Sequence, residues 1–117
     1  MSADFRIEEV ELGGEAQLLR VSGRLDAKNA QTFVARCREL RDGGTRQLVV
    51  NLAGVGFVAS SGVGVLLALT EEYQDAGGRV HLVALSEAVR SVLDLLNLTQ
   101  FLRIAASEKE VTTALGV

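Results

Sequence analysis

The strongest constraint on the fold is a regular alternation of two kinds of apolar segment along the chain. Short runs rich in Val, Ile and Leu, typical of strands, alternate with longer segments whose apolar residues recur every three or four positions, as on one face of a helix. Strands are predicted at residues 5–12, 15–22, 47–52, 80–85 and 101–104. Helices are predicted at residues 27–41, 87–97 and 108–115, with a further helix from the serine pair at 60–61 to about residue 76.

This order of elements restricts the architecture. From the second strand onward each strand is followed by a helix, and strand–helix–strand units join parallel strands through right-handed crossovers. Gly13-Gly14 favours the positive φ angles of a hairpin turn, which makes the first two strands antiparallel. The sequence therefore predicts an α/β domain in the order β-β-α-β-α-β-α-β-α, with a mixed four- to five-stranded sheet and helices packed on it. A slip in apolar phase between Ile7 and Val10 also predicts a β-bulge near Glu8-Glu9.

Short polar residues mark the predicted helix starts, because their side chains can accept a hydrogen bond from a free backbone N–H group. Asp26 is predicted to cap the first helix and Ser86 the third. Ser107 precedes the last helix with the spacing of a capping box. Ser60 or Ser61 is predicted to cap the second helix.

Length and composition limit the chain to a single domain, expected over residues 1–117. With 48% hydrophobic residues the chain can bury a core, which excludes general disorder. Twelve Lys and Arg against fifteen Asp and Glu give a net charge of −3, and no basic run exceeds two residues. Because a nucleic-acid interface normally needs a basic stripe, no nucleic-acid partner is expected.

Neither secretion nor direct membrane insertion is expected. The N-terminal residues lack the cationic segment and apolar run of a signal peptide. The uncharged segment 47–70 contains four glycines, so we interpret it as a buried strand, a loop and a buried helix rather than a membrane span. The lone Cys37 excludes a disulfide scaffold. A free thiol without a signal peptide indicates a cytoplasmic protein.

Residues that commonly carry catalysis are few and scattered. His81 is predicted to be a partly buried strand residue and Cys37 a core thiol, and one of each cannot form a zinc site. No Gly-x-Ser-x-Gly elbow and no P-loop lysine is present. Gly54-x-Gly56-x-x-Ala59 fits a dinucleotide fingerprint, but the serine cap signal comes later than that motif requires. No enzyme activity, metal or cofactor is therefore expected.

The most unusual segment is 53–61, where glycines precede two serines at a predicted helix start. A helix N-terminus offers free N–H donors and the positive end of the helix dipole, so the segment could bind an anion or carry one on a serine. Alternatively, one serine caps the helix and the glycines permit close packing. Like Gly23–Asp26, the segment follows the carboxyl end of a strand, where α/β sheets place their sites. Val55, Phe57 and Val58 are expected to pack on the sheet, with a partner contact as the alternative.

Three motifs together resemble a known family. They are Gly23-x-Leu25-Asp26 before the first helix, Phe57-Val58-x-Ser60-Ser61-Gly62-x-Gly64 after a strand that ends in Asn51-Leu52, and Gly77-Gly78 before the fourth strand. Their order and spacing resemble a STAS domain over about residues 4–115. More narrowly, they resemble the bacterial anti-sigma factor antagonists, whose strand and helix order is the one predicted above.

The resemblance implies a regulatory binding protein rather than an enzyme. In these antagonists the residue before the glycine, here Ser61, is phosphorylated by an anti-sigma factor with an ATP-binding kinase fold, and Ser60 is a second candidate acceptor. The unphosphorylated form binds the anti-sigma factor and frees a sigma factor, while the phosphorylated form releases its partner. A phosphatase resets the cycle. The expected oligomeric state is a monomer.

The partner-binding surface implied by the resemblance comprises Arg24, Asp26, Ala59, Ser60, Ser61 and Gly62. One position departs from the family, because its acidic residue falls on Ala59. The change removes repulsion against a phosphoserine, and it also removes a group that could orient the hydroxyl or a metal ion for the kinase. It favours an alternative, a stand-alone STAS subunit of a lipid or anion transporter or of a signalling scaffold, without phosphorylation. A third hypothesis is an enzyme or nucleotide-binding protein that uses the glycine-rich segment.

Overall fold

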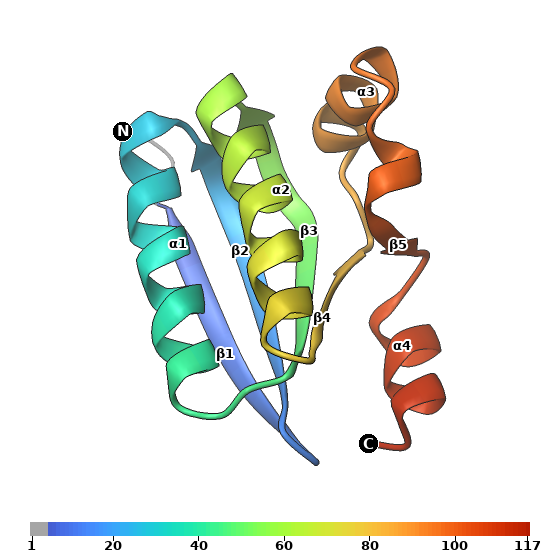
Figure 1. Ribbon diagram of the computed structural model, residues 1–117. Coiled ribbons are helices and arrows are strands. Elements are labelled where there is room, and N and C mark those ends of the chain that lie inside the picture. The colour runs from blue at the N-terminus through green and yellow to red at the C-terminus, as the bar shows by residue number, and fades with distance from the viewer. Residues whose placement is uncertain (1–4) are drawn as a thin grey trace.

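The computed structural model describes residues 5–117, which form one five-stranded sheet with helices packed against it (Figure 1). The strands are β1 (Arg6–Gly13), β2 (Ala16–Leu25), β3 (Gln47–Val58), β4 (Arg79–Val83) and β5 (Arg103–Ala105). The helices are α1 (Ala27–Asp42), α2 (Ser60–Asp75), α3 (Glu87–Leu95) and α4 (Glu108–Leu115), with a 3-10 turn at Thr99–Phe101. The predicted α/β class and element order are confirmed.

The strands lie side by side in chain order, with β1 antiparallel to β2 and every other neighbouring pair parallel. The predicted mixed sheet and hairpin are therefore confirmed. The predicted bulge near Glu8-Glu9 is wrong, because both residues pair regularly with β2. The irregularity lies beside the turn instead, between Glu11 and Gly13.

The apolar phase of β1 changes because both faces of the sheet carry apolar clusters. Ile7 pairs with Val21 on the face covered by α1, α2 and α3, whereas Val10 pairs with Leu18 on the face covered by α4. The larger cluster includes Leu19, Val21, Leu48, Val50, Leu52 and Leu82 of the strands with Phe33, Leu66 and Leu93 of the helices. The smaller cluster is Leu18, Val49, Val83 and Val111. A strand that borders both clusters needs apolar residues in both phases.

The glycine-rich segment predicted as a loop at Ala53–Ala59 continues the third strand instead. β3 extends to Val58, and β2 extends to Leu25, so the two strands pair along nearly their whole length. Gly54 permits this pairing, because a Cβ atom there would come within 2.7 Å of the Cβ of Ser22 on β2. The glycine serves close strand approach rather than a turn.

The uncharged segment 47–70 thus forms β3 and the first part of α2. None of the helices within residues 5–117 has the length and apolar content needed to cross a membrane.

The helix α4 is attached to the sheet by a polar cluster. The Glu108 carboxylate accepts two hydrogen bonds from the Arg20 guanidinium, at 2.9 and 3.0 Å, and one from the Asn51 side-chain amide at 2.6 Å. The Asn51 side-chain oxygen accepts a further bond from the Ala53 backbone N–H at 2.9 Å. Asn51, part of the motif recognised in the sequence, therefore has a structural role in seating α4 on β3.

The C-terminal elements differ slightly from their predicted bounds. β4 ends at Val83 because Ala84 adopts a positive φ of 53°, which a strand does not accommodate. α3 ends at Leu95 with Leu96 as its C-cap, and the next residue, Asn97, also has a positive φ, of 57°. β5 begins at Arg103, two residues later than predicted, because the preceding residues form the 3-10 turn.

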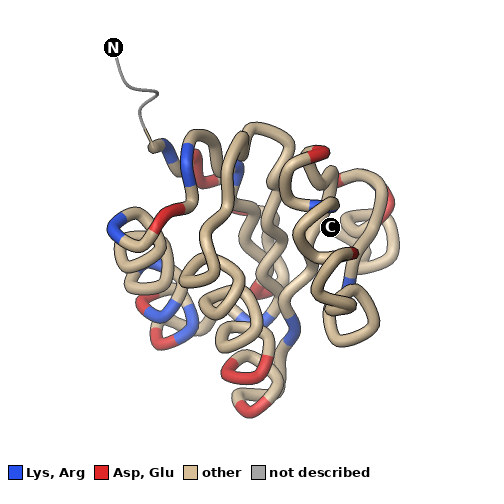
Figure 2. The backbone as a smooth tube through the Cα atoms, turned by 90° about the horizontal axis from the view of Figure 1, so that it is seen from above, with Lys and Arg blue, Asp and Glu red and all other residues tan. Residues whose placement is uncertain are grey.

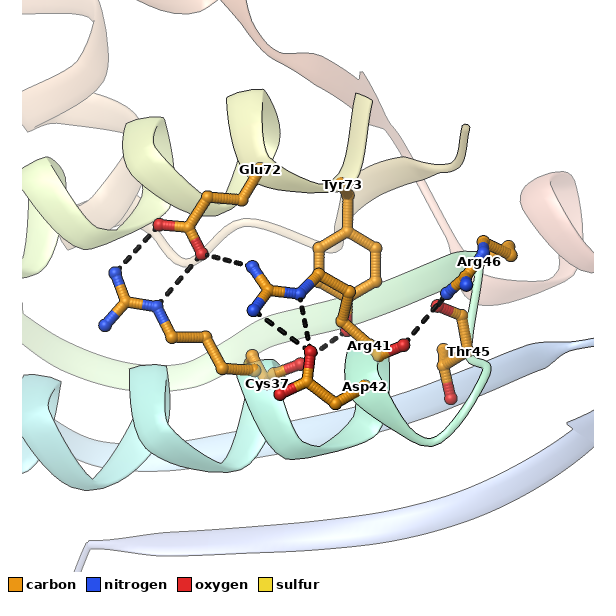
Figure 3. A network of polar contacts seen from close by, with 8 residues as sticks. Cys37, Arg41, Asp42, Thr45, Arg46, Glu72 and Tyr73 are labelled. Atoms are coloured by element: carbon orange, nitrogen blue, oxygen red, sulfur yellow. Dashed lines mark hydrogen bonds and ion pairs between the residues drawn. The ribbon is translucent and has the colours of Figure 1, made fainter. Parts of the chain in front are cut away.

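A polar network joins the C-terminal halves of α1 and α2 (Figure 3). The Glu72 carboxylate accepts hydrogen bonds from Arg38 at 2.9 and 2.8 Å and from Arg41 at 2.8 Å. Beneath it, the buried Tyr73 hydroxyl donates a 2.6 Å hydrogen bond to the Cys37 carbonyl oxygen. The predicted core thiol is confirmed, since Cys37 is fully buried, and burial raises the pKa of its thiol. These contacts fix α2 against α1 at the end remote from its first turn.

Candidate functional site

The first turn of α2 lies at the carboxyl ends of β2 and β3. Its N-cap residue is Ala59, which has no side-chain acceptor, and the two serines are the first two helical residues. The prediction that Ser60 or Ser61 caps this helix is therefore wrong. The reason is the length of β3, because a strand that continues to Val58 leaves only one residue between strand and helix.

The other helices show what a side-chain cap looks like in this protein. Asp26, Ser86 and Ser107 each accept a hydrogen bond from the backbone N–H three residues later, as predicted. By contrast, neither Ser60 nor Ser61 forms a side-chain hydrogen bond with another residue of the described chain, 5–117. Ser60 is exposed and Ser61 is half-buried. Their hydroxyl groups are thus not used by the fold.

Gly62 sets the position of this turn against β2. A Cβ atom at Gly62 would come within 2.7 Å of the Leu25 carbonyl oxygen and 2.9 Å of Cγ2 of Val58. The Ala59 backbone N–H donates to the same Leu25 carbonyl oxygen at 3.0 Å. Ala59 and Gly62, which flank the serine pair, both contact the Leu25 carbonyl group, so the pair is held beside the end of β2. Its position is determined by backbone contacts rather than by its own side chains.

The segment that follows β2 is fixed by the first turn of α1. The Asp26 carboxylate accepts a hydrogen bond from the Asn29 backbone N–H at 2.9 Å, and the Asn29 side-chain amide donates to the Arg24 carbonyl oxygen at 2.8 Å. The structure therefore brings the predicted surface residues Arg24 and Asp26 beside Ala59, Ser60, Ser61 and Gly62, as expected from the sequence. Their role in binding a partner stays a prediction.

The apolar residues near the end of β3 divide between core and surface. Val55 is fully buried and Val58 is only 7% exposed, which confirms the predicted packing for these two. Phe57 is 39% exposed, and the Arg24 guanidinium lies over its ring at 4.0 Å from the centroid. The strand register shifts between the pairs Gly23–Val55 and Arg24–Phe57, so Phe57 does not follow Val55 into the core. The expected packing on the sheet is therefore wrong for Phe57, and the partner contact given as the alternative stays a prediction.

The end of β3 and the start of α2 contribute no charge to the site, because both belong to the uncharged segment 47–70. The nearest charged residues of the site are Arg24 and Asp26, at the end of β2. In the view from above, most charged positions lie toward the outside of the molecule (Figure 2). Ala59, immediately before the pair, adds no carboxylate. A charge introduced here would therefore change the surface potential sharply.

Two further residues considered from the sequence lie away from this site. His81 is half-buried in the middle of β4, as predicted, and its Nε2 atom is 2.8 Å from the Gln47 side-chain oxygen. Burial, together with Arg103 and Arg79, lowers the pKa of His81. No cluster of three or more His, Cys, Asp or Glu side chains that could bind a metal ion occurs in the part of the chain that the structure describes.

The sequence is similar to known proteins over most of its length. The STAS domain family model matches residues 9–111. An anti-sigma F factor antagonist of Lysinibacillus sphaericus is 28% identical over 104 residues, which cover 88% of this chain and 89% of that protein.

Two solved structures are also similar. The anti-sigma factor antagonist SpoIIAA in its unphosphorylated form is 26% identical, with a TM-score of 0.78 and coverage of 97% of this chain and 98% of the other. The Bacillus cell fate determinant SpoIIAA in its phosphorylated form is 26% identical, with a TM-score of 0.72 and coverage of 96% and 99%.

These matches agree with the motifs and with the strand and helix order. The family model covers most of the chain, including both segments that form the candidate site. The resemblance inferred from the sequence is confirmed, and the chain belongs to the STAS domain family.

Proposed function

We propose that this protein is an anti-sigma factor antagonist whose binding is controlled by phosphorylation of Ser61. The unphosphorylated protein binds an anti-sigma factor with a kinase fold and thereby frees a sigma factor. Phosphorylation of Ser61 by that partner ends the binding, and a phosphatase restores it. The protein acts as a monomeric binding module and not as an enzyme.

The observation that carries this proposal is a pair of serines at a helix start that cap nothing. Ala59 occupies the N-cap position, so the Ser61 hydroxyl is left for another use. A relative that is 26% identical over nearly the whole chain has been solved in an unphosphorylated and a phosphorylated form. A relative of similar length is named an anti-sigma F factor antagonist. Together these support a phosphorylated serine on this surface.

The physical basis of the switch is a charge added where the end of β3 and the start of α2 carry none. A phosphate on Ser61 carries a charge near −2 and lies at the N-terminus of α2, where the helix dipole favours it by about 0.3–1 kcal/mol. The helix therefore stays folded, and release originates at the interface. Burying that charge against a partner surface that was complementary to a hydroxyl costs about 2–5 kcal/mol, or roughly 30-fold to several-thousand-fold in affinity.

The test is an affinity capture from cells of the source organism with four baits. Wild type and Ser61→Ala are expected to retain an anti-sigma factor with a kinase fold, while Ser61→Asp is expected to lose it. Thr113→Asp adds the same charge to an exposed position of α4, on the other side of the sheet, and is expected to bind like wild type. Incubation of the captured kinase with ATP should then place phosphate on Ser61, as read by mass spectrometry.

Ala59 favours a second candidate function, a STAS subunit of a lipid or anion transporter or of a signalling scaffold without phosphorylation. On that alternative all four baits retain the same partner, and that partner is a transporter or scaffold component. Equal binding of the native partner by wild type and Ser61→Asp would falsify the phosphorylation switch. The identity of the retained protein would then define the function.

A further inference from the structure

The Arg24 guanidinium contacts an aromatic ring instead of a carboxylate. It lies over the ring of Phe57 at 4.0 Å, and no ion pair of Arg24 is found within residues 5–117. Several other arginines do form ion pairs, namely Arg20, Arg36, Arg38 and Arg41. An exposed cation over an aromatic face is held less strongly than one in a bidentate, charge-assisted pair. The Arg24 side chain is thus available to a new anion.

The backbone of Arg24, in contrast, is fixed. Its carbonyl oxygen accepts a 2.8 Å hydrogen bond from the Asn29 side chain, and its residue pairs with Phe57 in the ladder between β2 and β3. Asp26, two residues later, is tied to α1 through its own capping bond. Any movement of Arg24 is therefore a rotation of the side chain about a fixed main chain, which is small in scale and leaves the fold unchanged.

The fixed backbone places Arg24 next to the serine pair. The ladder pair after Arg24 and Phe57 is Leu25 and Val58, and Leu25 contacts the residues on both sides of the serines. Arg24 is thus the chain neighbour of the residue that contacts both ends of the serine pair. In the structure the guanidinium faces Phe57 rather than Ser61, so rotation of its long side chain is needed to bring it to a group on the Ser61 oxygen.

We propose that Arg24 is the internal ligand of a phosphate on Ser61, and that it leaves Phe57 when the phosphate is added. The inference rests on the proposed function, because it assigns a regulatory contact to the same serine. A planar guanidinium matches two phosphate oxygens at once, which an aromatic face cannot offer. Ala59 supplies no competing carboxylate, and the nearby Asp26 carboxylate already accepts a hydrogen bond from the Asn29 backbone N–H.

This contact changes what a partner encounters. In the unmodified protein Arg24 and Phe57 form one exposed platform beside two free hydroxyl groups. In the modified protein the guanidinium is bound to the phosphate, and the face of Phe57 is uncovered. A partner that binds the platform thus loses the Arg24 contact in the same step in which it meets the phosphate.

The experiment needs neither a kinase nor a partner, since phosphoserine can be introduced at position 61 by genetic encoding. The second pKa of the phosphate, near 6 for an isolated phosphoserine, is measured by phosphorus NMR titration. Because an adjacent cation favours the dianion, we expect this pKa in the wild-type background to lie about one unit below that in Arg24→Gln. Arg24→Lys retains a cation without the planar fork and should restore part of the shift.

Two matched variants test whether the effect belongs to Arg24. Lys28 is an exposed cation in the first turn of α1, and Arg103 is an exposed arginine on β5, away from the site. Lys28→Gln and Arg103→Gln are expected to leave the phosphate pKa within about 0.2 unit of wild type, less than one screened surface charge usually contributes. If Lys28→Gln raises it as much as Arg24→Gln does, or if Arg24→Gln leaves it unchanged, the assignment to Arg24 is overturned.

A second readout follows the Arg24–Phe57 contact directly. Nuclear Overhauser effects between the Arg24 side chain and the Phe57 ring should be present in the unmodified protein and lost after phosphoserine is installed. Persistence of these effects in the phosphoprotein contradicts the proposed movement. A failure of these measurements leaves the capture experiment unaffected, and a failure of the capture experiment leaves these measurements unaffected, so the two proposals fail separately.

Discussion

Gly62 on α2 lies against the Leu25 carbonyl oxygen on β2 so closely that a Cβ at position 62 would be 2.7 Å from that oxygen. The oxygen also accepts the Ala59 backbone N–H. This single carbonyl group is where the end of β2 and the start of α2 meet. The position of the serine pair depends on it, and a substitution at Gly62 tests that dependence.

Gly62→Ala is expected to destabilise the protein by about 1–3 kcal/mol, because the added methyl group must push α2 away from β2. Gly64 is the matched control, since it lies one turn into the same helix and a Cβ there meets nothing within 4 Å. Gly64→Ala should stabilise the helix by about 0.5–1 kcal/mol. Urea denaturation of the three proteins measures both values. Equal stabilities for the two variants would contradict the close contact.

Replacing a serine by alanine should lower the stability of the protein only where the serine caps a helix. Ser86 accepts the Val89 N–H at 3.2 Å and donates to the Val55 carbonyl oxygen at 2.5 Å, so Ser86→Ala should cost about 1–2 kcal/mol of stability. Ser61→Ala removes no such bond and should change stability by less than about 0.5 kcal/mol. Thermal unfolding followed by circular dichroism distinguishes the two. If Ser61→Ala lowers the stability as much as Ser86→Ala does, Ser61 caps α2 in solution.

The network on Glu72 predicts a dependence of stability on pH. Hydrogen bonds from Arg38, opposed in part by burial and aided by the charges of Arg38 and Arg41, hold the pKa of Glu72 below its ordinary value of 4.5. The unfolded chain therefore binds the proton more readily, and the contribution of Glu72 is complete above pH 4.5 and is lost as the pH falls through the lowered pKa. At neutral pH Glu72→Gln should be less stable by about 1 kcal/mol.

The measurement is urea denaturation of wild type and Glu72→Gln between neutral and acidic pH. The difference in free energy of unfolding should shrink as the solution becomes acidic. Glu71→Gln is the control, because Glu71 is exposed and forms no ion pair within the described residues. A difference between wild type and Glu72→Gln that is constant with pH would rule out an electrostatic origin.

The Cys37 thiol should not react with labelling reagents in the folded protein. It is fully buried, its thiol pKa is raised by that burial, and its carbonyl oxygen accepts the Tyr73 hydroxyl. Because only the thiolate reacts, labelling by a disulfide reagent should proceed at the rate at which the core opens and should become rapid in denaturant. Tyr73→Phe, which leaves the carbonyl oxygen without its donor, should accelerate labelling. Prompt labelling of the native wild type contradicts the buried position.

The parts of the fold that local chemistry determines were predictable from the sequence. Three helix starts were predicted from a short polar residue whose side chain accepts a hydrogen bond from a nearby backbone N–H group. The structure confirms all three caps, Asp26, Ser86 and Ser107. The alternation of strands and helices likewise predicted the element order and the parallel pairing that follows the first hairpin. These signals depend only on residues a few positions apart.

The errors arise where a distant neighbour overrides a local preference. The glycines after Leu52 favour a loop locally, but pairing with β2 along its full length extends β3 to Val58. The same extension moves the N-cap to Ala59 and frees the serines, which no pattern within the segment could reveal. The expected packing of Phe57 is wrong for a related reason, since its direction depends on the register shift between β2 and β3 after Val55. The residues predicted for the candidate site do lie near one another, but their geometry required the neighbouring strand, and their role stays a prediction.

The contacts that hold both ends of α2 have a consequence for how a change at Ser61 could act. One end of α2 is fixed on Leu25 and the other is bound to α1 through Glu72. Under the proposed function, the phosphorylated and unphosphorylated forms would therefore share one backbone conformation. The two forms would then differ in charge and not in backbone conformation. Phosphorylation and dephosphorylation would require no refolding, so the rate of the cycle would be set by the kinase and the phosphatase and not by a conformational change of this protein.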